Sequence, residues 1–250
     1  YPLSYTTRLD QSVEESRNEF EAFWVPFGFK DFQLSFNWRN YRHLETRDPE
    51  ENEFWGALNF NTRHGNHRWW TNLDVSSNGS ESLYGGFLLW YGRRIHTSIH
   101  LQAGKTWGNL TTGHNTYRIG GNVIEGYFTK RPTRLFPLRG FESNILEAGQ
   151  AVTSGIEVFW PLANIQKGYK TLPLFLHRLR LGTFVDAGMS ADDLAAENLL
   201  MGAGFELITS MEIAWGNLSS FRMGVAWPIR QPDYLNEEGP VFLIQLGRPL

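Results

Sequence analysis

Hydrophobic and polar residues alternate with a period of two along most of the chain. The alternation is clearest in residues 32–38, 69–75, 95–101, 221–227 and 242–246. Successive side chains of a β-strand point to opposite faces, whereas an amphipathic helix repeats its apolar positions every 3.6 residues. Clusters of turn-forming residues separate the runs. The pattern therefore predicts an all-β protein built from hairpins.

Counting the runs between turn clusters predicts about twelve strands. Most of them have about 9–13 residues, which is long for a globular strand and suits a strand that crosses a membrane at a tilt. A short helix is predicted only at 191–199, within a loop. The expected strands are 20–28, 31–42, 52–62, 67–77, 81–91, 93–104, 116–127, 148–161, 174–188, 197–213, 218–228 and 240–248.

A soluble β-sandwich and a membrane β-barrel both produce this alternation. Strand length favours the barrel, and so does an apolar face with aromatic residues near the strand ends, as in an interfacial girdle. The opposite face carries charged, amide and glycine residues, which suits a watery lumen. The girdle candidates are Trp24, Trp38, Trp55, Trp160 and Trp227. The residues expected to face lipid are Leu34, Phe36, Leu73, Ile99, Leu101, Leu181, Val225 and Ile244.

Composition narrows the function classes. The 250 residues suffice for one large domain or two small ones, and the net charge of −3 gives no positive field to attract nucleic acid. The chain has no cysteine, which excludes disulfides and cysteine-based zinc sites. Its longest largely apolar stretches, near 23–29 and 85–91, are too short for a membrane helix. Because the chain opens on Tyr1, we expect a mature or excised segment.

A string of motifs occurs in a characteristic order from about residue 116 to the end. Leu138-Arg139-Gly140-Phe141 looks like a (V/L/I)RG(F/Y) signature, and Phe184-Val185-Asp186-Ala187-Gly188 matches an FxDxG strand motif. Strand-like stretches at 154–162, 202–204, 224–228 and 242–247 complete the order. In this region the chain resembles the bacterial surface antigen superfamily, which comprises outer-membrane protein assembly and secretion barrels.

The resemblance implies a loop, here 128–147, that folds into the lumen and carries the signature at its tip. Arg139 is then expected to reach a carboxylate on the following strands, Asp186 first and Glu157 second. A guanidinium in a confined lumen needs such a partner, because an unpaired buried charge is costly. Gly140 would allow the sharp turn and Phe141 would supply an apolar plug.

Phasing on the strands agrees with this implication. A period of two places Phe184, Asp186 and Gly188 on the same face as Arg178 and Arg180, and it places Glu157 on the lumen face of its own strand. Glu206 and Glu212 also phase inward, where we interpret them as ordinary hydrated lumen charges.

No catalytic or metal constellation emerges from the sequence. His96 and His100 lie four apart, which on a strand separates them by roughly 13 Å, too far to share one ion. The string 76–80 superficially resembles the active-site string of the outer-membrane phospholipase. However, Val75 stands where that enzyme has histidine, so a hairpin turn is the better interpretation. We predict a non-enzyme without metal or cofactor.

The predicted protein is a single barrel domain over 1–250, with about twelve strands, or the carboxyl-terminal part of a sixteen-stranded barrel. The resemblance implies insertion or translocation of protein in the bacterial outer membrane. The implied partners are outer-membrane lipid, an unfolded or passenger polypeptide, and a separate amino-terminal periplasmic domain. Two alternatives stay open. One is a barrel that anchors or exports a missing amino-terminal domain, and the other is a passive pore or a barrel enzyme.

Overall fold

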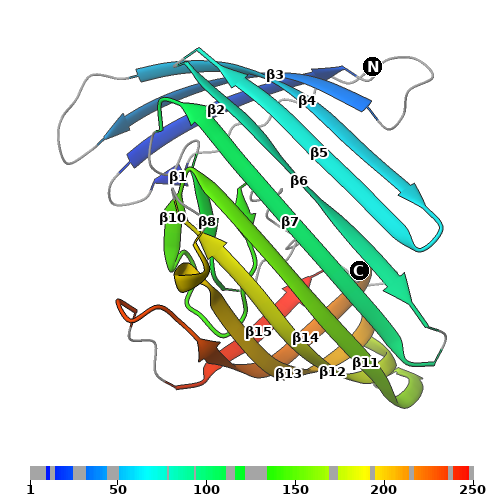
Figure 1. Cartoon of the computed structure of the whole chain (residues 1–250). Coiled ribbons are helices and arrows are strands. Elements are labelled where there is room, and N and C mark those ends of the chain that lie inside the picture. The colour runs from blue at the N-terminus through cyan, green and yellow to red at the C-terminus, as the bar shows by residue number, and fades with distance from the viewer. Residues whose placement is uncertain are drawn as a thin grey trace.

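The computed structural model of the chain describes twelve stretches of residues, most of them strands (Figure 1). The described residues are 10–11, 15–24, 32–43, 51–77, 79–92, 94–110, 116–121, 134–168, 174–191, 195–213, 217–235 and 239–247. Side chains are described from residue 54 onward, with the exception of residue 55. Within these stretches the only helix is η1 (Ala196–Asn198), a single 3₁₀ turn inside the predicted 191–199 segment.

One antiparallel sheet of twelve strands makes up most of the fold. Its order is β1-β2-β3-β4-β5-β6-β7-β11-β12-β13-β14-β15. The first seven are β1 (Asp10–Gln11), β2 (Glu15–Trp24), β3 (Phe32–His43), β4 (Glu51–His64), β5 (His67–Ser76), β6 (Ser80–Tyr91) and β7 (His96–Gly108). The last five are β11 (Gln150–Gly168), β12 (Leu174–Ser190), β13 (Leu200–Ile213), β14 (Asn217–Arg230) and β15 (Val241–Gly247). The predicted all-β antiparallel architecture is confirmed.

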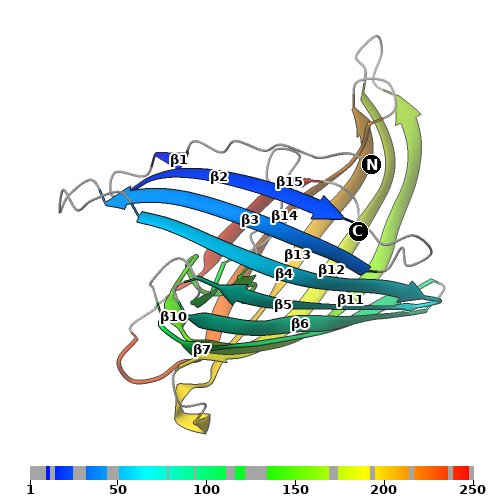
Figure 2. The ribbon, with the colours of Figure 1, turned by 90° about the horizontal axis from the view of Figure 1, so that it is seen from above.

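The sheet curls strongly and has a concave and a convex face (Figures 1 and 2). Among the described residues, no pairing joins β15 to the first strands. Neighbouring strands in chain order pair as hairpins throughout, except where β7 pairs with β11. The described residues between these two strands, 109–110, 116–121 and 134–149, are called the inner segment below.

The predicted strand over 116–127 is wrong as a strand of the large sheet at 116–121, and residues 122–127 lie outside the described residues. Residues 117–119 form β8 (Tyr117–Ile119), which belongs to a second, three-stranded sheet with β9 (Leu135–Phe136) and β10 (Leu146–Ala148). Tyr117 and Ile119 are fully buried, so burial alternates along this short strand as it would along a strand of the large sheet. The large sheet still has twelve strands, because it includes β1, which the sequence pattern does not predict.

The inner segment packs against the concave face of the large sheet. Its small sheet contacts β11 and β12. The hydrophobic core lies at this junction and contains Tyr84, Tyr117, Ile119, Phe136, Leu138, Phe141, Ala151 and Leu200. Because five of these eight residues come from the inner segment, burial of this core holds that segment against the large sheet.

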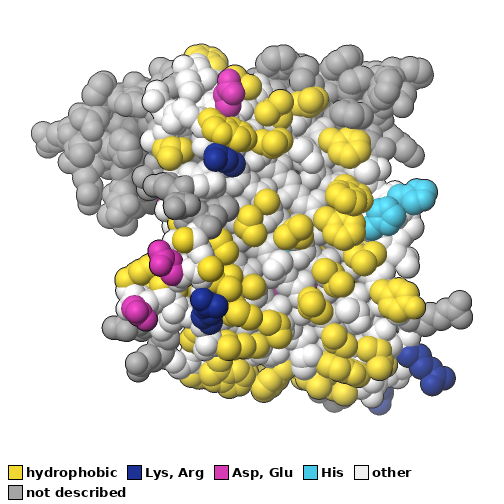
Figure 3. Space-filling view, in the orientation of Figure 1, with side chains coloured by type: hydrophobic (Ala, Val, Ile, Leu, Met, Phe, Trp, Pro, Cys, Tyr) yellow, Lys and Arg dark blue, Asp and Glu magenta, His cyan; other side chains and the backbone are white. Residues whose placement is uncertain are grey.

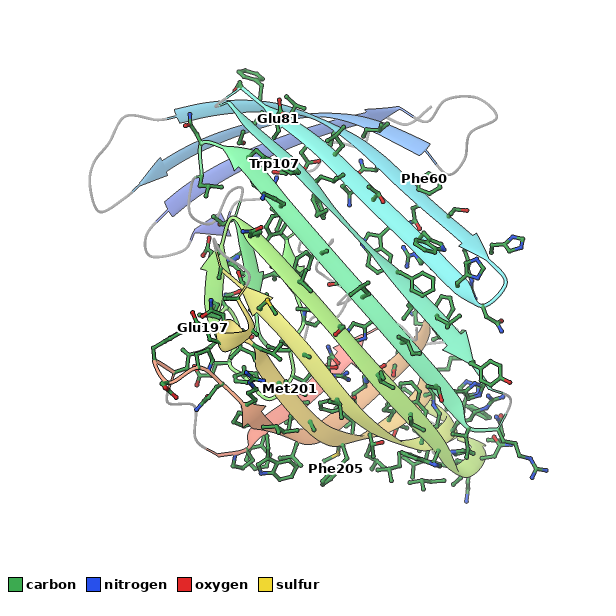
Figure 4. All side chains as sticks on the ribbon, viewed as in Figure 1. Phe60, Glu81, Trp107, Glu197, Met201 and Phe205 are labelled. Atoms are coloured by element: carbon green, nitrogen blue, oxygen red, sulfur yellow. The ribbon has the colours of Figure 1, made fainter. Side chains whose placement is uncertain are left out.

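The convex face carries the apolar alternation, as predicted (Figure 3). Leu73, Ile99, Leu101 and Ile244 are exposed on it, while the residues between them are mostly buried or half-buried on the concave side. Leu181 and Val225 share strands and facing with exposed Val185 and Met223. The ring of Phe205 lies on this face beside Trp227, their centroids 5.9 Å apart (Figure 4). The side chains of Leu34, Phe36, Trp24, Trp38 and Trp55 lie outside the described residues.

Trp227 is exposed near the end of β14, as expected of a girdle residue, whereas Trp160 is half-buried near the middle of β11. Within the described stretches, no helix is long and apolar enough to cross a membrane.

An arginine at Leu101 tests which environment the convex face meets. If the face contacts hydrocarbon and Leu101 lies near the midplane, Leu101→Arg should lower the free energy of unfolding in lipid vesicles by about 2–4 kcal/mol. Urea titration of the refolded chain measures it. Leu110→Arg is the matched control, because Leu110 is 47% exposed against 48% for Leu101 but lies beyond the end of β7. Equal losses in the two variants would contradict a lipid-facing Leu101.

Candidate functional site

Arg139 lies in a turn of the inner segment, three residues after β9, and its side chain forks onto Asp186 of β12. The Nε atom donates to Asp186 Oδ2 at 2.6 Å, and Nη2 donates to Asp186 Oδ1 at 2.8 Å. The backbone amide of Arg139 also donates to Asp186 Oδ2, at 3.2 Å. This bidentate geometry with a charged donor and acceptor is the strongest arrangement available to the two side chains.

The remaining donor of the fork, Nη1, bonds to two further carboxylates. It donates to Glu157 Oε1 of β11, and to Glu206 Oε1 of β13 at 3.1 Å. Exposure is 4% for Arg139, 1% for Asp186 and 1% for Glu206. One guanidinium therefore ties the inner segment to three adjacent strands at a site from which water is almost excluded.

A second arginine reduces the excess of negative charge at the site. Arg222 of β14 places its Nε 2.7 Å from Glu206 Oε2 and its Nη2 3.5 Å from Glu157 Oε1. Arg139, Arg222, Asp186, Glu157 and Glu206 are together called the Arg139 cluster. Its two cations and three carboxylates come from the inner segment and from four consecutive strands. The cluster therefore joins the inner segment to the large sheet and joins those strands to one another. Buried charges of this kind require such mutual pairing.

Burial and pairing act in opposite directions on Arg139. Burial by itself would lower the pKa of its guanidinium. The hydrogen bonds to Asp186 and the charges of Glu157 and Glu206 outweigh burial and hold that pKa above its usual value. Arg139 therefore stays charged at every pH at which the protein folds, and it acts as a fixed ionic tie.

Two glycines make the approach of the inner segment possible. Gly140 has a φ of +98°, and a Cβ on it would lie 2.8 Å from the carbonyl oxygen of Trp227. Gly155 pairs with Asp186 across β11 and β12, and a Cβ there would overlap both Asp186 Oδ1 and the His100 ring. Each position thus needs glycine, the first for its backbone conformation and the second for space.

The aromatic residues of the two motifs have different positions. Phe184 lies under the guanidinium, with Arg139 Cζ 3.7 Å from the ring centroid, which is a close cation–π contact. Phe141 belongs to the hydrophobic core and is fully buried. One phenylalanine covers the ionic site, and the other anchors the turn next to it.

Comparison with known proteins adds the fold. No protein-family model matches the chain, and no curated protein matches its sequence. Among solved structures, CdiB from Escherichia coli matches with a TM-score of 0.61 at 15% identity, over 91% of this chain and 44% of that one. BamA from Haemophilus ducreyi lacking POTRA domains 1-3 matches with a TM-score of 0.59 at 14% identity, over 94% and 55%.

The chain therefore shares its fold with the CdiB and BamA barrels. The chain spans about half the length of these two neighbours. Asp186 lies on β12 and Glu157 lies on β11, each within the strand predicted for it. The signature residue Arg139 lies in the segment between β7 and β11.

The structure brings together most, but not all, of the candidate site residues that were predicted from the sequence. Arg139, Gly140, Glu157, Phe184 and Asp186 meet at one site. Gly188 lies further along β12, opposite Thr153. Arg178 is exposed, and Arg180 lies over the Phe159 ring at 5.6 Å, so neither joins the Arg139 cluster.

Two members of the cluster differ from the sequence interpretation. Glu206 is no hydrated lumen charge, because it is almost completely buried and bound by two arginines. Arg222 belongs to none of the motifs found in the sequence. Its inward phasing on β14 was readable, but its partner Glu206 depends on the register between β13 and β14, in which Arg222 pairs with Ile208.

The histidines and the serine string carry no catalytic arrangement in the described residues. His100 faces the concave side beside Gly155, and its buried Nε2 has no hydrogen-bond partner within the described part of the chain. No group of three potential metal ligands occurs among the described residues. The string 76–80 connects β5 to β6, and Gly79 N donates to Ser76 O within it, as in a hairpin turn.

Proposed function

We propose that the chain is an outer-membrane β-barrel of the bacterial surface antigen superfamily that takes part in the insertion or translocation of protein. The contacts of Arg139 with three carboxylates carry the proposal. They join the superfamily's signature turn to its strand motif inside a sheet with the superfamily's fold. The exposed apolar convex face supports a position in lipid.

The inner segment acts as a plug in this proposal. It packs apolar residues against the concave side of the sheet, and Arg139 ties its tip to β12. We further propose that the whole chain is one barrel domain and that the plug includes residues 128–147. An unfolded or passenger polypeptide would be the cargo, and a separate amino-terminal periplasmic domain would be the partner.

The role proposed for the Arg139 cluster is structural rather than catalytic. Each of its carboxylates is paired with at least one guanidinium group, which suits a tie between the inner segment and the large sheet. A general acid or base would instead need a carboxyl group free to exchange a proton with substrate. We therefore propose no enzymatic activity, metal or cofactor.

Vesicles that contain the purified chain provide the test. An unfolded outer-membrane protein is added, and the fraction that becomes protease-resistant in the membrane is followed with time. We expect faster insertion than in empty vesicles, and a severalfold slower rate with Arg139→Ala. Arg230→Ala should behave like the unchanged protein, because Arg230 is exposed and bonds only to a loop carbonyl of Ala196 among the described residues.

Equal insertion rates with and without the chain would contradict the proposed function. Vesicles that leak ions but insert no protein would instead identify a passive pore.

A further inference from the structure

A second arginine of the inner segment lies against a neighbouring part of the large sheet. Arg134 is five residues before Arg139 and points to β5 and β7 instead of β11–β14. Its Nη2 lies 3.1 Å from Asp74 Oδ2, and its Nη1 donates to Thr106 Oγ1 at 3.3 Å. Asp74 and Thr106 are both buried.

Aromatic rings enclose the same guanidinium. Arg134 Cζ lies 5.7 Å from the ring centroid of Tyr84 on β6 and 5.5 Å from that of Tyr117 on β8. The Tyr117 ring stacks in turn on Phe136, with centroids 5.4 Å apart and an interplanar angle of 9°. An ion pair held between two rings is a built site, since each ring favours a cation over its face and excludes water from the pair.

The two arginines tie the segment 134–139 to two different parts of the wall. Five residues of extended chain reach at most about 18 Å, so this segment acts as a short strut along the concave face of the large sheet. One end meets β5, β6 and β7, and the other meets β11, β12 and β13. The backbone supports the first end as well, because Arg118 N donates to Arg134 O at 3.0 Å and thus links β8 to it.

We propose that Arg134 is a positioning residue that forms a second latch, with Asp74 as its partner, and that it docks the plug independently of Arg139. Release of the plug then requires two separate events, one at each end of the segment 134–139. The inference rests on the proposed function only in treating the inner segment as a plug. Neither the signature turn nor the strand motif includes Arg134 or Asp74.

Because the chain contains no cysteine, a single introduced thiol can report each latch. Ser82→Cys places a thiol beneath the Arg134 side, since Ser82 Oγ is 3.0 Å from Thr106 Oγ1 and buried. Ala226→Cys places one on the other side, where Ala226 is fully buried next to Trp227, whose carbonyl the Gly140 backbone approaches. The rate of reaction with a water-soluble maleimide is measured on the folded full chain in vesicles, with heat-dependent gel migration as the check on folding.

Arg134→Ala should raise the labelling rate of the thiol at position 82 by about tenfold, because local opening no longer breaks an ion pair. The labelling rate of the thiol at position 226 should stay unchanged. Asp74→Asn should give the same result. The exchanged pair Asp74→Arg with Arg134→Asp should restore slow labelling, which a general packing defect would not. Arg230→Ala is the control and should change neither rate.

An unchanged labelling rate at position 82 in both Arg134→Ala and Asp74→Asn would overturn the second latch, as would equal acceleration at the two thiols. If Arg134→Ala fails to fold, Asp74→Asn decides alone. The labelling rates require no cargo, so a failed insertion assay with the expected labelling would reject the proposed function and leave the latch standing.

Discussion

Arg139→Ala should lower the free energy of unfolding of the chain in lipid vesicles by about 3–5 kcal/mol. The substitution leaves Asp186 buried without the two hydrogen bonds from the guanidinium, and it removes one of two cations from Glu157 and Glu206. The backbone amide of residue 139 remains as a donor to Asp186, but it is neutral. Uncompensated carboxylates in a dry site account for most of the expected loss.

Arg139→Lys should recover only a small part of this stability. An ammonium is a single point charge and cannot bond to both oxygens of Asp186 while also reaching Glu157 and Glu206. Arg178→Ala is the matched control, since Arg178 is exposed on the same strand as Asp186. Its effect should stay within about 0.5 kcal/mol. Urea unfolding with unchanged slope measures all three variants. A loss for Arg139→Ala as small as that for Arg178→Ala would contradict the ionic tie.

Phe141→Ala should cost about 3–5 kcal/mol by a different mechanism. Phe141 is fully buried in the core between the inner segment and the wall, so its removal loses apolar burial and leaves a cavity. The surrounding side chains come from separate strands and can close the cavity only in part. The charges of the Arg139 cluster stay in place, so the loss should be insensitive to salt.

Tyr234→Ala is the control for this aromatic truncation. Tyr234 is exposed in the loop between β14 and β15, and its hydroxyl bonds weakly to Asn198 Oδ1 at 3.5 Å. We expect a change of about 0.5 kcal/mol or less. If Phe141→Ala and Tyr234→Ala unfold at the same urea concentration, the inner segment is not packed against the wall in the membrane.

The faces of the strands could be predicted from the sequence because alternation is a local signal. Leu73, Leu101 and Ile244 project outward, and Asp186 and Glu157 project inward, as a period of two requires. The same signal failed at 116–127. Tyr117 and Ile119 alternate with Arg118 as in a wall strand, yet they belong to the small inner sheet. Period two identifies a strand but not the sheet that it joins.

The sequence predicted only some of the members of the Arg139 cluster. The motifs identified Arg139 with Asp186 and Glu157, because the signature and the strand motif occur in a fixed order. Glu206 and Arg222 were missed as members, because their contact depends on strand register and on where a loop tip lands. Arg134 and Asp74 are sixty residues apart without any motif, so only the folded chain brings them together.

A double-mutant cycle between Arg139 and Asp186 tests the central claim, that this ion pair holds the inner segment inside the sheet, most directly. The free energies of unfolding of Arg139→Ala, Asp186→Ala and the double variant are compared with that of the unchanged chain. We predict that the double variant is more stable than the sum of the single losses implies, by about 1–3 kcal/mol, because removing both charges leaves neither stranded. Losses that add to within about 0.5 kcal/mol would contradict the claim.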